Sequence, residues 1–236
     1  GSEKCRSLKF LRCGSGPISA SLHRQVEATF GVPLIVSYGV SEATCTSTMN
    51  LPSARRIGSV GTVLSGQQVR VFRPGSTERV EAGCEGEIAI AGPSVMRGYL
   101  NGGGEQPVKE GWLRTGDLGS FDRDGYLTIT GRLKDVIVRA GENLSPRAIE
   151  VVLERHPAVG SSCVVGVPHT DLGEAPVAFV QLRSGEKVDD AELKVLVETQ
   201  LSRIHVPLEV RFVAGWPETS IGKIDRRALK DSLADV

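Results

Sequence analysis

The sequence lacks several features that mark particular classes of protein. It contains no run of about 20 apolar residues, which a membrane-spanning helix needs, and no charged-then-apolar leader precedes its first expected strand. Lysine plus arginine equals aspartate plus glutamate at 28 each, so no net charge attracts nucleic acid or an anionic membrane. These absences favour a cytoplasmic protein without a transmembrane segment that acts on small molecules rather than on nucleic acid.

Cysteine and histidine are sparse and scattered. The cysteines are odd in number and widely spaced, and no CxxC motif occurs, so neither a disulfide framework nor a zinc site is predicted. A reducing compartment is therefore expected. The histidines have no metal-site spacing and no clear partner, and we interpret them as structural or surface residues. The residues are Cys5, Cys13, Cys45, Cys84 and Cys163, and His23, His156, His169 and His205.

A βαβ unit is predicted near the start of the chain, with strands at residues 8–12 and 33–38. The helix between them has apolar residues at i, i+4 and i+8, which predict its buried stripe: Leu22, Val26 and Phe30. Parallel strands normally sit in larger sheets that are covered on both faces. We therefore expect this sheet to include strands that would precede residue 1.

Short alternating strands separated by Gly and Pro turns follow between Gly58 and Gly131. This pattern of short strands and turns predicts a small antiparallel barrel or sandwich, with strands at 68–72, 86–90 and 126–130. The glycine run at 101–104 is expected to be a flexible loop inside it, because strand-like sequence resumes on both sides.

The last third of the chain has a mixed α+β pattern. Helix starts are marked by capping residues, namely Ser145 followed by Pro146, Asp189 or Asp190, and Asp225. Strands are expected at 161–167, 175–182 and 208–213. The predicted fold class is thus α/β plus α+β. Residues 1–132 form a partial parallel-sheet lobe with a small β-barrel subdomain, and residues 133–236 form a small C-terminal α+β domain.

Three short motifs occupy positions where ligands commonly bind. Tyr38-Gly39-Val40-Ser41-Glu42 follows an apolar parallel strand, the place where open α/β sheets bind ligands, although it also fits a simple strand-end turn. Gly14-Ser15-Gly16-Pro17 is a strand-to-helix loop of a common kind. Thr115-Gly116-Asp117 fits an Asx turn between strands as well as a carboxylate site.

A fourth motif, Pro217 to Arg226, places Lys223 behind a tight glycine turn and just ahead of a short amphipathic helix. Taken alone, this lysine would be interpreted as a solvated surface residue. The motifs occur in a fixed order along the chain, together with Gly131-Arg132-Leu133-Lys134-Asp135. Taken together, they resemble the carboxyl-terminal half of an adenylate-forming acyl-CoA synthetase, one of the AMP-dependent ligases of the ANL superfamily. The resemblance covers nearly all of the chain.

The resemblance implies an acid–CoA ligase that converts ATP, a carboxylic acid and coenzyme A into acyl-CoA, AMP and pyrophosphate through an acyl-adenylate. It implies that Tyr38 stacks on adenine, that Asp117 accepts hydrogen bonds from both ribose hydroxyls, and that Glu42 coordinates Mg²⁺ between ATP phosphates. Ser41 stands where threonine is commoner in the family. The implied nucleotide-binding residues are Gly14, Ser15, Gly16, Pro17, Tyr38, Gly39, Ser41, Asp117 and Arg132.

For the C-terminal domain the resemblance implies a mobile unit that turns about a hinge at Lys134 between two half-reactions. Lys223 would be catalytic, bridging the attacking carboxylate and the α-phosphate of ATP. The CoA-binding residues would be Gly141, Glu142 and Asn143.

The family's Ser/Thr/Gly-rich phosphate loop, which lies ahead of the Gly14 motif, has no counterpart in the sequence. We therefore expect a fragment whose partner is the missing N-terminal half and which alone is inactive or partly active. Two alternatives remain open: an adenylating enzyme that loads the pantetheine of a carrier protein, and a non-catalytic binding or regulatory fragment in which Lys223 is modified. The sequence does not identify the acid.

Overall fold

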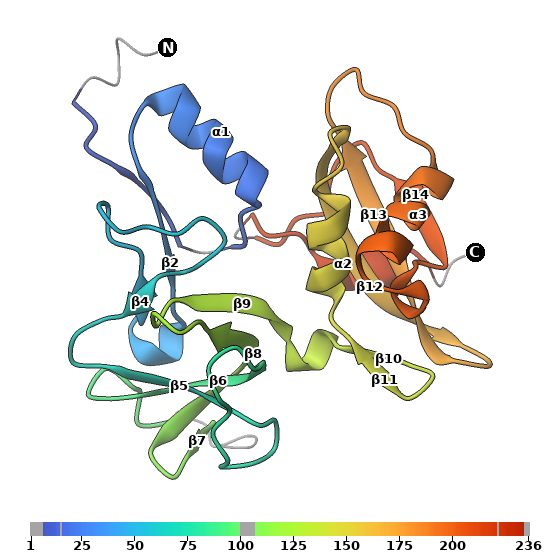
Figure 1. The fold of residues 1–236 in the computed structure, drawn as a ribbon. Coiled ribbons are helices and arrows are strands. Elements are labelled where there is room, and N and C mark those ends of the chain that lie inside the picture. Colours follow the sequence, from blue (N-terminus) through green and yellow to red (C-terminus); the bar gives the residue numbers. More distant parts are fainter. Residues whose placement is uncertain (1–6, 15, 100–106, 221, 234–236) are drawn as a thin grey trace. The chain divides into compact units, whose positions relative to one another are not determined.

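The computed structural model describes residues 7–14, 16–99, 107–220 and 222–233 (Figure 1). The chain forms two compact units, Gly1–Leu133 and Lys134–Val236. The assignment of separate functional domains to residues 1–132 and 133–236 stays a prediction. The predicted glycine-rich loop at 101–104 lies outside the described residues.

The first unit begins with the predicted βαβ arrangement, which is confirmed. Strands β1 (Leu11–Cys13) and β2 (Leu34–Tyr38) pair in parallel, and helix α1 (Ala20–Phe30) connects them. Ser19 caps this helix by accepting a hydrogen bond from the Leu22 amide, and Gly31 ends it in the left-handed conformation. Two short antiparallel strands, β3 (Thr48–Met49) and β4 (Thr62–Val63), extend the sheet in the order β1-β2-β3-β4.

The predicted buried face of α1 is wrong. Leu22 and Phe30 are 48% and 41% exposed, whereas His23, one position after Leu22, is only 1% exposed. The reason is a polar contact: Glu27 Oε1 accepts hydrogen bonds from the Leu34 amide at 2.8 Å and from Arg55 Nε at 2.6 Å. His23 Nε2 lies 3.3 Å from the same carboxylate oxygen, so this histidine has a partner that the sequence did not reveal.

An antiparallel sheet completes the first unit, as predicted. Its order is β5-β6-β8-β7, with β9 paired to β8. A helical turn, η2 (Ser41–Ala43), joins the two sheets, because Ala43 packs into the core of the antiparallel sheet with Ile88 and Leu127. The strands are β5 (Gln68–Phe72), β6 (Gly86–Ala91), β7 (Val108–Lys109), β8 (Trp112–Phe121) and β9 (Leu127–Arg132).

The second unit is a mixed sheet with helices on both faces. The sheet order is β11-β10-β13-β12, and β14 pairs in parallel with β13. The helical turn η3 (Leu133–Asp135) spans the division between the units. The elements after it are β10 (Ile137–Arg139), β11 (Glu142–Leu144), α2 (Pro146–Leu153), β12 (Val159–His169), β13 (Gly173–Leu182), α3 (Asp190–Gln200), η4 (Arg203–His205), β14 (Glu209–Phe212) and α4 (Arg226–Asp231).

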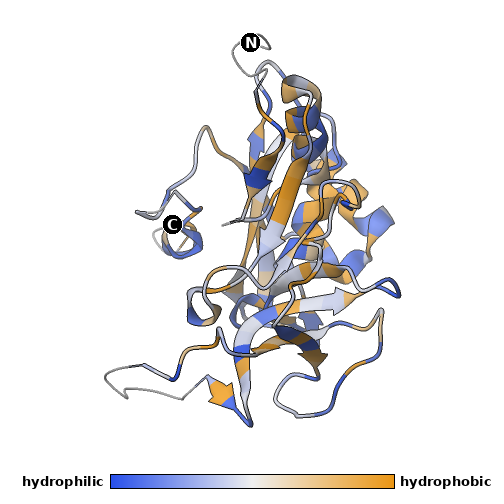
Figure 2. Ribbon diagram, turned by 90° about the vertical axis from the view of Figure 1, so that its left-hand side faces the viewer, coloured by the Kyte–Doolittle hydropathy of each residue, from blue (hydrophilic) through white to orange (hydrophobic). Residues whose placement is uncertain are grey.

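Successive side chains of the central strands point to opposite faces of this sheet, so the unit has a core on each face. Val164, Ala178 and Val180 pack with α2 and α3, whereas Cys163 and Phe179 pack with α4 on the other face. Figure 2 shows that helices of the protein carry hydrophobic and hydrophilic residues side by side, as amphipathic helices do. The predicted α/β plus α+β fold class is confirmed. No helix among the described residues is long and apolar enough to cross a membrane.

Candidate functional site

A buried carboxylate lies where the two sheets of the first unit meet. The side chain of Asp117 on β8 is 6% exposed. Its Oδ2 atom accepts a hydrogen bond from the Tyr38 hydroxyl at 2.8 Å, and its Oδ1 atom accepts one from Arg132 Nε at 2.7 Å. Tyr38 ends the parallel strand β2, and Arg132 stands opposite Asp117 in the β8–β9 pairing. Three residues predicted from separate motifs are thus in direct contact.

The Tyr38 hydroxyl is held in its protonated form. Burial and the neighbouring negative charge of Asp117 raise the pKa of Tyr38 well above its ordinary value. The hydroxyl therefore remains a donor to the carboxylate at physiological pH. Because a carboxylate has about four acceptor positions, Asp117 keeps acceptor capacity beyond these two bonds.

The turn that carries Asp117 is fixed by a buried ion pair that sequence reasoning missed. Gly116 has a φ of 71°, and its amide donates to Glu87 Oε1 at 3.2 Å. Glu87 is also paired with Arg114, whose Nε donates to Oε2 at 2.8 Å. The available signal was a carboxylate inside the apolar run Gly86 to Ile90, because a charge in a buried strand requires a partner.

Gly39 is required where the chain leaves β2. A Cβ atom at this position would lie 1.9 Å from the carbonyl oxygen of Cys45, a contact that no side chain can make. The chain turns back here, since the Cys45 amide donates to the Val40 carbonyl at 3.1 Å. This reversal places Ser41 and Glu42 in the first turn after the strand.

Glu42 is partly buried, and its side chain has a hydrogen-bond partner. Its Oε1 atom accepts a hydrogen bond from the Tyr99 hydroxyl at 2.8 Å, and its backbone carbonyl accepts one from the Met96 amide at 2.7 Å. Across the described ranges no group of three or more His, Cys, Asp or Glu residues could hold a metal ion.

The glycine loop after β1 adjoins the end of β2. A Cβ atom on Gly14 would approach Ser37 Oγ to 2.7 Å, whereas Gly16 has open space around the corresponding position. Ser15 lies outside the described residues, and Pro17 follows two residues later, before α1. Gly14 lies just beyond the carboxyl end of β1, and Tyr38 lies at the carboxyl end of β2, which is parallel to β1. Open α/β sheets bind ligands at this edge.

Lys223 belongs to the second unit and is an exposed residue at the end of a tight loop. The Thr219 amide donates to the Lys223 carbonyl at 2.7 Å, and the Lys223 amide donates to Thr219 Oγ1 at 3.2 Å. Gly222, with a φ of 72°, supplies the left-handed turn. Asp225 then caps α4 by accepting from the Arg227 and Ala228 amides, as predicted.

A buried charge anchors this loop to the core of the second unit. Arg226 Nη2 donates to Glu150 Oε1 at 2.6 Å, and Arg226 Nη1 donates to the Val164 carbonyl at 2.7 Å. Glu150, on α2, is 1% exposed and also accepts from the Val164 amide at 2.9 Å. The sequence placed Arg226 in the lysine motif but did not reveal this partner, 76 residues away.

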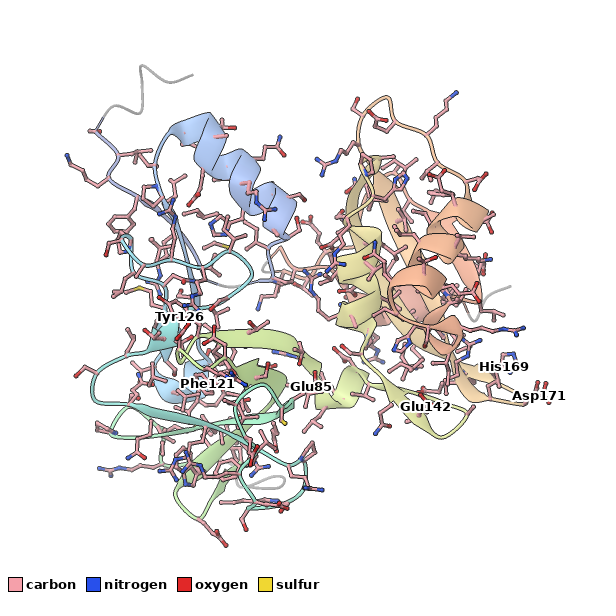
Figure 3. All side chains as sticks on the ribbon, viewed as in Figure 1. Glu85, Phe121, Tyr126, Glu142, His169 and Asp171 are labelled. Atoms are coloured by element: carbon pink, nitrogen blue, oxygen red, sulfur yellow. The ribbon has the colours of Figure 1, made fainter. Side chains whose placement is uncertain are left out.

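The predicted CoA-binding residues form an exposed hairpin. Arg139 pairs with Glu142, so Ala140 and Gly141 make a two-residue turn with φ values of 50° and 85°, the type I′ geometry. Glu142 and Asn143 are exposed. Figure 3 shows Glu142 near the β12–β13 turn that carries His169 and Asp171, and the Ala140 amide donates to the Leu172 carbonyl at 2.8 Å.

The predicted site residues divide between the two units. Those assigned to the nucleotide lie in the first unit, and Lys223 and the hairpin lie in the second. Lys134, the predicted hinge, belongs to η3, and the units divide between Leu133 and Lys134.

Sequence comparison identifies two families on this chain. The family described as AMP-binding enzyme matches residues 2–100, and the family described as AMP-binding enzyme C-terminal domain matches residues 148–223. The chain is 40% identical over 228 residues to sulfoacetate–CoA ligase of Cupriavidus necator, an alignment that covers 94% of this chain and 44% of that protein. The chain therefore spans less than half the length of this relative.

Solved structures agree with this relationship. ATP-bound MatB from Rhodopseudomonas palustris has a TM-score of 0.89 and 33% identity, covering 96% of this chain and 46% of that one. The amide bond synthetase McbA from Marinactinospora thermotolerans has a TM-score of 0.90 and 35% identity, covering 97% and 47%. The chain belongs to the family of AMP-binding, adenylate-forming ligases and matches the carboxyl-terminal part of its relatives.

Proposed function

We propose that this chain supplies the nucleotide-facing and CoA-facing residues of an acid–CoA ligase. The reaction would join a carboxylic acid to coenzyme A by way of an acyl-adenylate, with release of AMP and pyrophosphate. The observation that carries the proposal is the buried Asp117 carboxylate between Tyr38 and Arg132. The name of the sulfoacetate–CoA ligase, 40% identical to this chain, supports the same reaction class.

In this proposal Asp117 accepts hydrogen bonds from the two ribose hydroxyls, because a carboxylate offers paired acceptors and no donor. Tyr38 lies against the adenine ring, and the backbone of Gly14, Gly16 and Gly39 contacts the nucleotide. Gly16 has open space where a side chain would lie, so the backbone can approach the ring closely there. Ser15 and Pro17 complete that loop, and Ser41 contacts the nucleotide. Arg132, whose side chain is 52% exposed, is free to reach the ribose or phosphate while it orients Asp117.

The first half-reaction would form the acyl-adenylate. A carboxylate oxygen of the acid attacks the α-phosphorus of ATP, the bond to the β,γ-diphosphate breaks, and pyrophosphate leaves with the bonding electrons. Lys223 would stabilise the negative charge that develops on the phosphoryl oxygens. Its exposure at the end of a short, hydrogen-bonded loop suits a residue that acts on a substrate outside its own unit.

A magnesium ion is implied by the family. The residues fit an ion held mostly by nucleotide phosphates, because Glu42 belongs to no described group of three or more potential ligands. Mg²⁺ typically takes one or two carboxylates and keeps phosphate and water ligands. When bound, Mg²⁺ would neutralise charge on the ATP phosphates. Glu42 would hold it through the oxygen that does not bond Tyr99.

The second half-reaction would transfer the acyl group. The CoA sulfur attacks the acyl carbonyl carbon, the thiol proton is lost to solvent, and AMP leaves with its oxygen as the acyl–phosphate bond breaks. The exposed hairpin residues Gly141, Glu142 and Asn143 would line the path of the pantetheine arm. A rotation about Lys134 between the two half-reactions is supported by its position at the division between the units.

The experiment that tests this function separates the two half-reactions. The second needs no phosphate loop, so a synthetic acyl-adenylate is mixed with CoA and the purified chain, and acyl-CoA is measured. We expect acyl-CoA above the uncatalysed rate, loss of that rate in Gly141→Leu, and little change in Lys223→Ala. An uncatalysed rate in all three proteins would contradict the proposal.

We expect that the chain alone does not catalyse adenylation. The sequence contains no counterpart of the family's phosphate loop, so pyrophosphate–ATP exchange requires an enzyme that carries this loop, on the same polypeptide or on another. Exchange is measured with Mg²⁺ across a panel of acids that includes sulfoacetate. Exchange by the chain alone would overturn this expectation and would identify the substrate class.

One observation supports an acyl acceptor other than CoA. McbA, which superposes on this chain with a TM-score of 0.90, is an amide bond synthetase. The same fold therefore serves a different acyl acceptor in that protein. The acyl-adenylate assay distinguishes the candidates when free CoA, a pantetheine-bearing carrier protein and an amine are compared at equal concentration. Faster transfer of the acyl group to the carrier protein or to the amine would mean that this compound, and not CoA, is the acceptor.

A further inference from the structure

The antiparallel sheet of the first unit contains a cavity that none of the proposed chemistry uses. Its volume is about 590 Å³, within the range of about 300–1,000 Å³ typical of small-molecule sites. Strand β5, the turn at residues 75–79 and the β7–β8 hairpin line it. Thr115 and Gly116 also line it, whereas Asp117, Tyr38 and Arg132 do not.

Basic residues outnumber acidic residues in the lining of the cavity. Four basic and two acidic residues line it, namely Arg70, Arg79, Lys109 and Arg114, and Glu87 and Glu110. Arg114 is paired with Glu87. Arg70 and Arg79 have no carboxylate within ion-pair distance among residues 7–14, 16–99, 107–220 and 222–233. Two guanidinium groups are thus available to a ligand.

Aromatic rings hold two of the arginines in place. The Arg70 guanidinium carbon lies 4.7 Å from the centroid of the Trp112 ring, and that of Arg114 lies 5.0 Å from the centroid of Phe72. The two rings meet edge to face at 5.4 Å. A guanidinium has its N–H donors in a planar fork, and contact with an aromatic ring restricts its orientation before a ligand arrives.

We propose that this cavity binds a small phosphate-bearing anion. A guanidinium fork matches two phosphate oxygens at once, and Arg70 and Arg79 provide two such forks beside an aromatic wall. The chain as a whole has a formal net charge of zero, so the positive character is local to the cavity. This favours a small anion over an extended nucleic acid backbone.

Inorganic pyrophosphate is the probe. Binding is measured by titration calorimetry on the whole chain without Mg²⁺, at constant ionic strength, and with sodium sulfate as the comparison anion. We expect saturable binding of pyrophosphate that the double variant Arg70→Gln, Arg79→Gln weakens by about tenfold or more, since hydrogen bonds to charged groups are strong. Circular dichroism verifies that the variant is folded. Arg70→Lys, which keeps the charge but loses the fork, should weaken binding by a smaller factor.

Two matched controls make the test decisive. Arg73 lies between β5 and this turn but pairs with Glu78 and does not line the cavity, so Arg73→Gln should bind pyrophosphate as the wild type does. Asp124→Asn, a substitution of an exposed carboxylate that pairs with Arg56 and does not line the cavity, should also leave this binding unchanged. The absence of saturable binding, an equal loss in Arg73→Gln, equal binding of sulfate, or a loss in Asp124→Asn would each overturn the proposal.

Discussion

At the scale of single residues, the candidate site depends on how buried charges are paired. Asp117 is buried but has two donors, and Glu87 behind it neutralises Arg114 while it binds the Gly116 amide. An unpaired buried charge is costly, so each of these groups is needed to keep the next one in position. The geometry of the turn at residues 115–117 follows from these pairs and not from the local sequence alone.

The Glu87–Arg114 pair provides the first prediction. Glu87→Ala leaves Arg114 buried without its carboxylate and the Gly116 amide without its acceptor. We expect the free energy of unfolding of the first unit to fall by about 3 kcal/mol, as when one partner of a buried pair is removed. Urea unfolding measures this. The double variant Glu87→Leu, Arg114→Leu should recover part of the loss. A double variant that is less stable than Glu87→Ala would contradict the explanation.

Glu27 provides a prediction about pH. The hydrogen bond from Arg55 lowers the pKa of Glu27 to about 2, assisted by the bond from the Leu34 amide. Because the ordinary pKa is about 4.3, this stabilisation is complete above that pH and is lost as the pH falls toward 2. Arg55→Gln should therefore reduce the dependence of stability on pH in the acid range.

Denaturant unfolding of both proteins at a series of acid pH values measures the difference. Arg24→Gln is the control, because Arg24 lies on the same helix and bonds only the Ala20 carbonyl among the contacts of the described chain. If the free energy of unfolding depends equally on pH in the wild type and in Arg55→Gln, the Glu27 bonds do not stabilise the folded state.

At the scale of elements, periodicity located most strands and helices but not every buried face. The strand at 68–72 was predicted with the bounds that β5 has, since alternating apolar residues are a local signal. The buried stripe of α1 was wrong because Glu27 binds the start of β2 and Arg55, which turns the His23 side of the helix inward. Apolar spacing does not reveal such contacts between distant residues.

The same limit applies to the site. Tyr38, Asp117 and Arg132 could be selected because each belongs to a recognisable short motif. Glu87 lies 29 residues from Gly116, and Glu150 lies 76 residues from Arg226. Each pairing depends on strand register or helix packing, and these are not encoded in a short window of sequence.

The lysine loop provides a prediction at this scale, because two adjacent arginines differ in environment. Arg226 bonds the buried Glu150, whereas the side chain of Arg227 is 92% exposed and lies 3.8 Å from Asp231. Arg226→Gln should destabilise the second unit by about 1–2 kcal/mol, the lower part of the range for a charged hydrogen bond because Arg226 is partly exposed. Arg227→Gln should change stability by less than about 0.5 kcal/mol.

Hydrogen exchange adds a local measurement to this pair of variants. The amides of Thr219, Gly222 and Lys223 are hydrogen-bonded within the loop, so Arg226→Gln should accelerate their exchange while Arg227→Gln should not. Equal exchange in the two variants would show that Glu150 does not anchor the lysine loop.

At the scale of the whole molecule, the two units have separate cores and are expected to unfold separately. Ile88 and Leu127 belong to the core of the first unit, whereas Ile149 and Val164 belong to that of the second. Calorimetry should resolve two transitions. Glu87→Ala should lower the midpoint of one, and Arg226→Gln should lower that of the other. A single transition that both substitutions shift equally would contradict two independent units.

The central claim is that Asp117 forms the nucleotide site of this chain. The most direct measurement is the binding of AMP to the purified chain by titration calorimetry, compared among the wild type, Asp117→Asn and Asp124→Asn. Asp124 is an exposed carboxylate that pairs with Arg56 in the turn after β8. We predict saturable AMP binding that Asp117→Asn weakens by about tenfold or more and that Asp124→Asn leaves unchanged. No AMP binding by the wild type, or equal affinity in Asp117→Asn, would contradict the account.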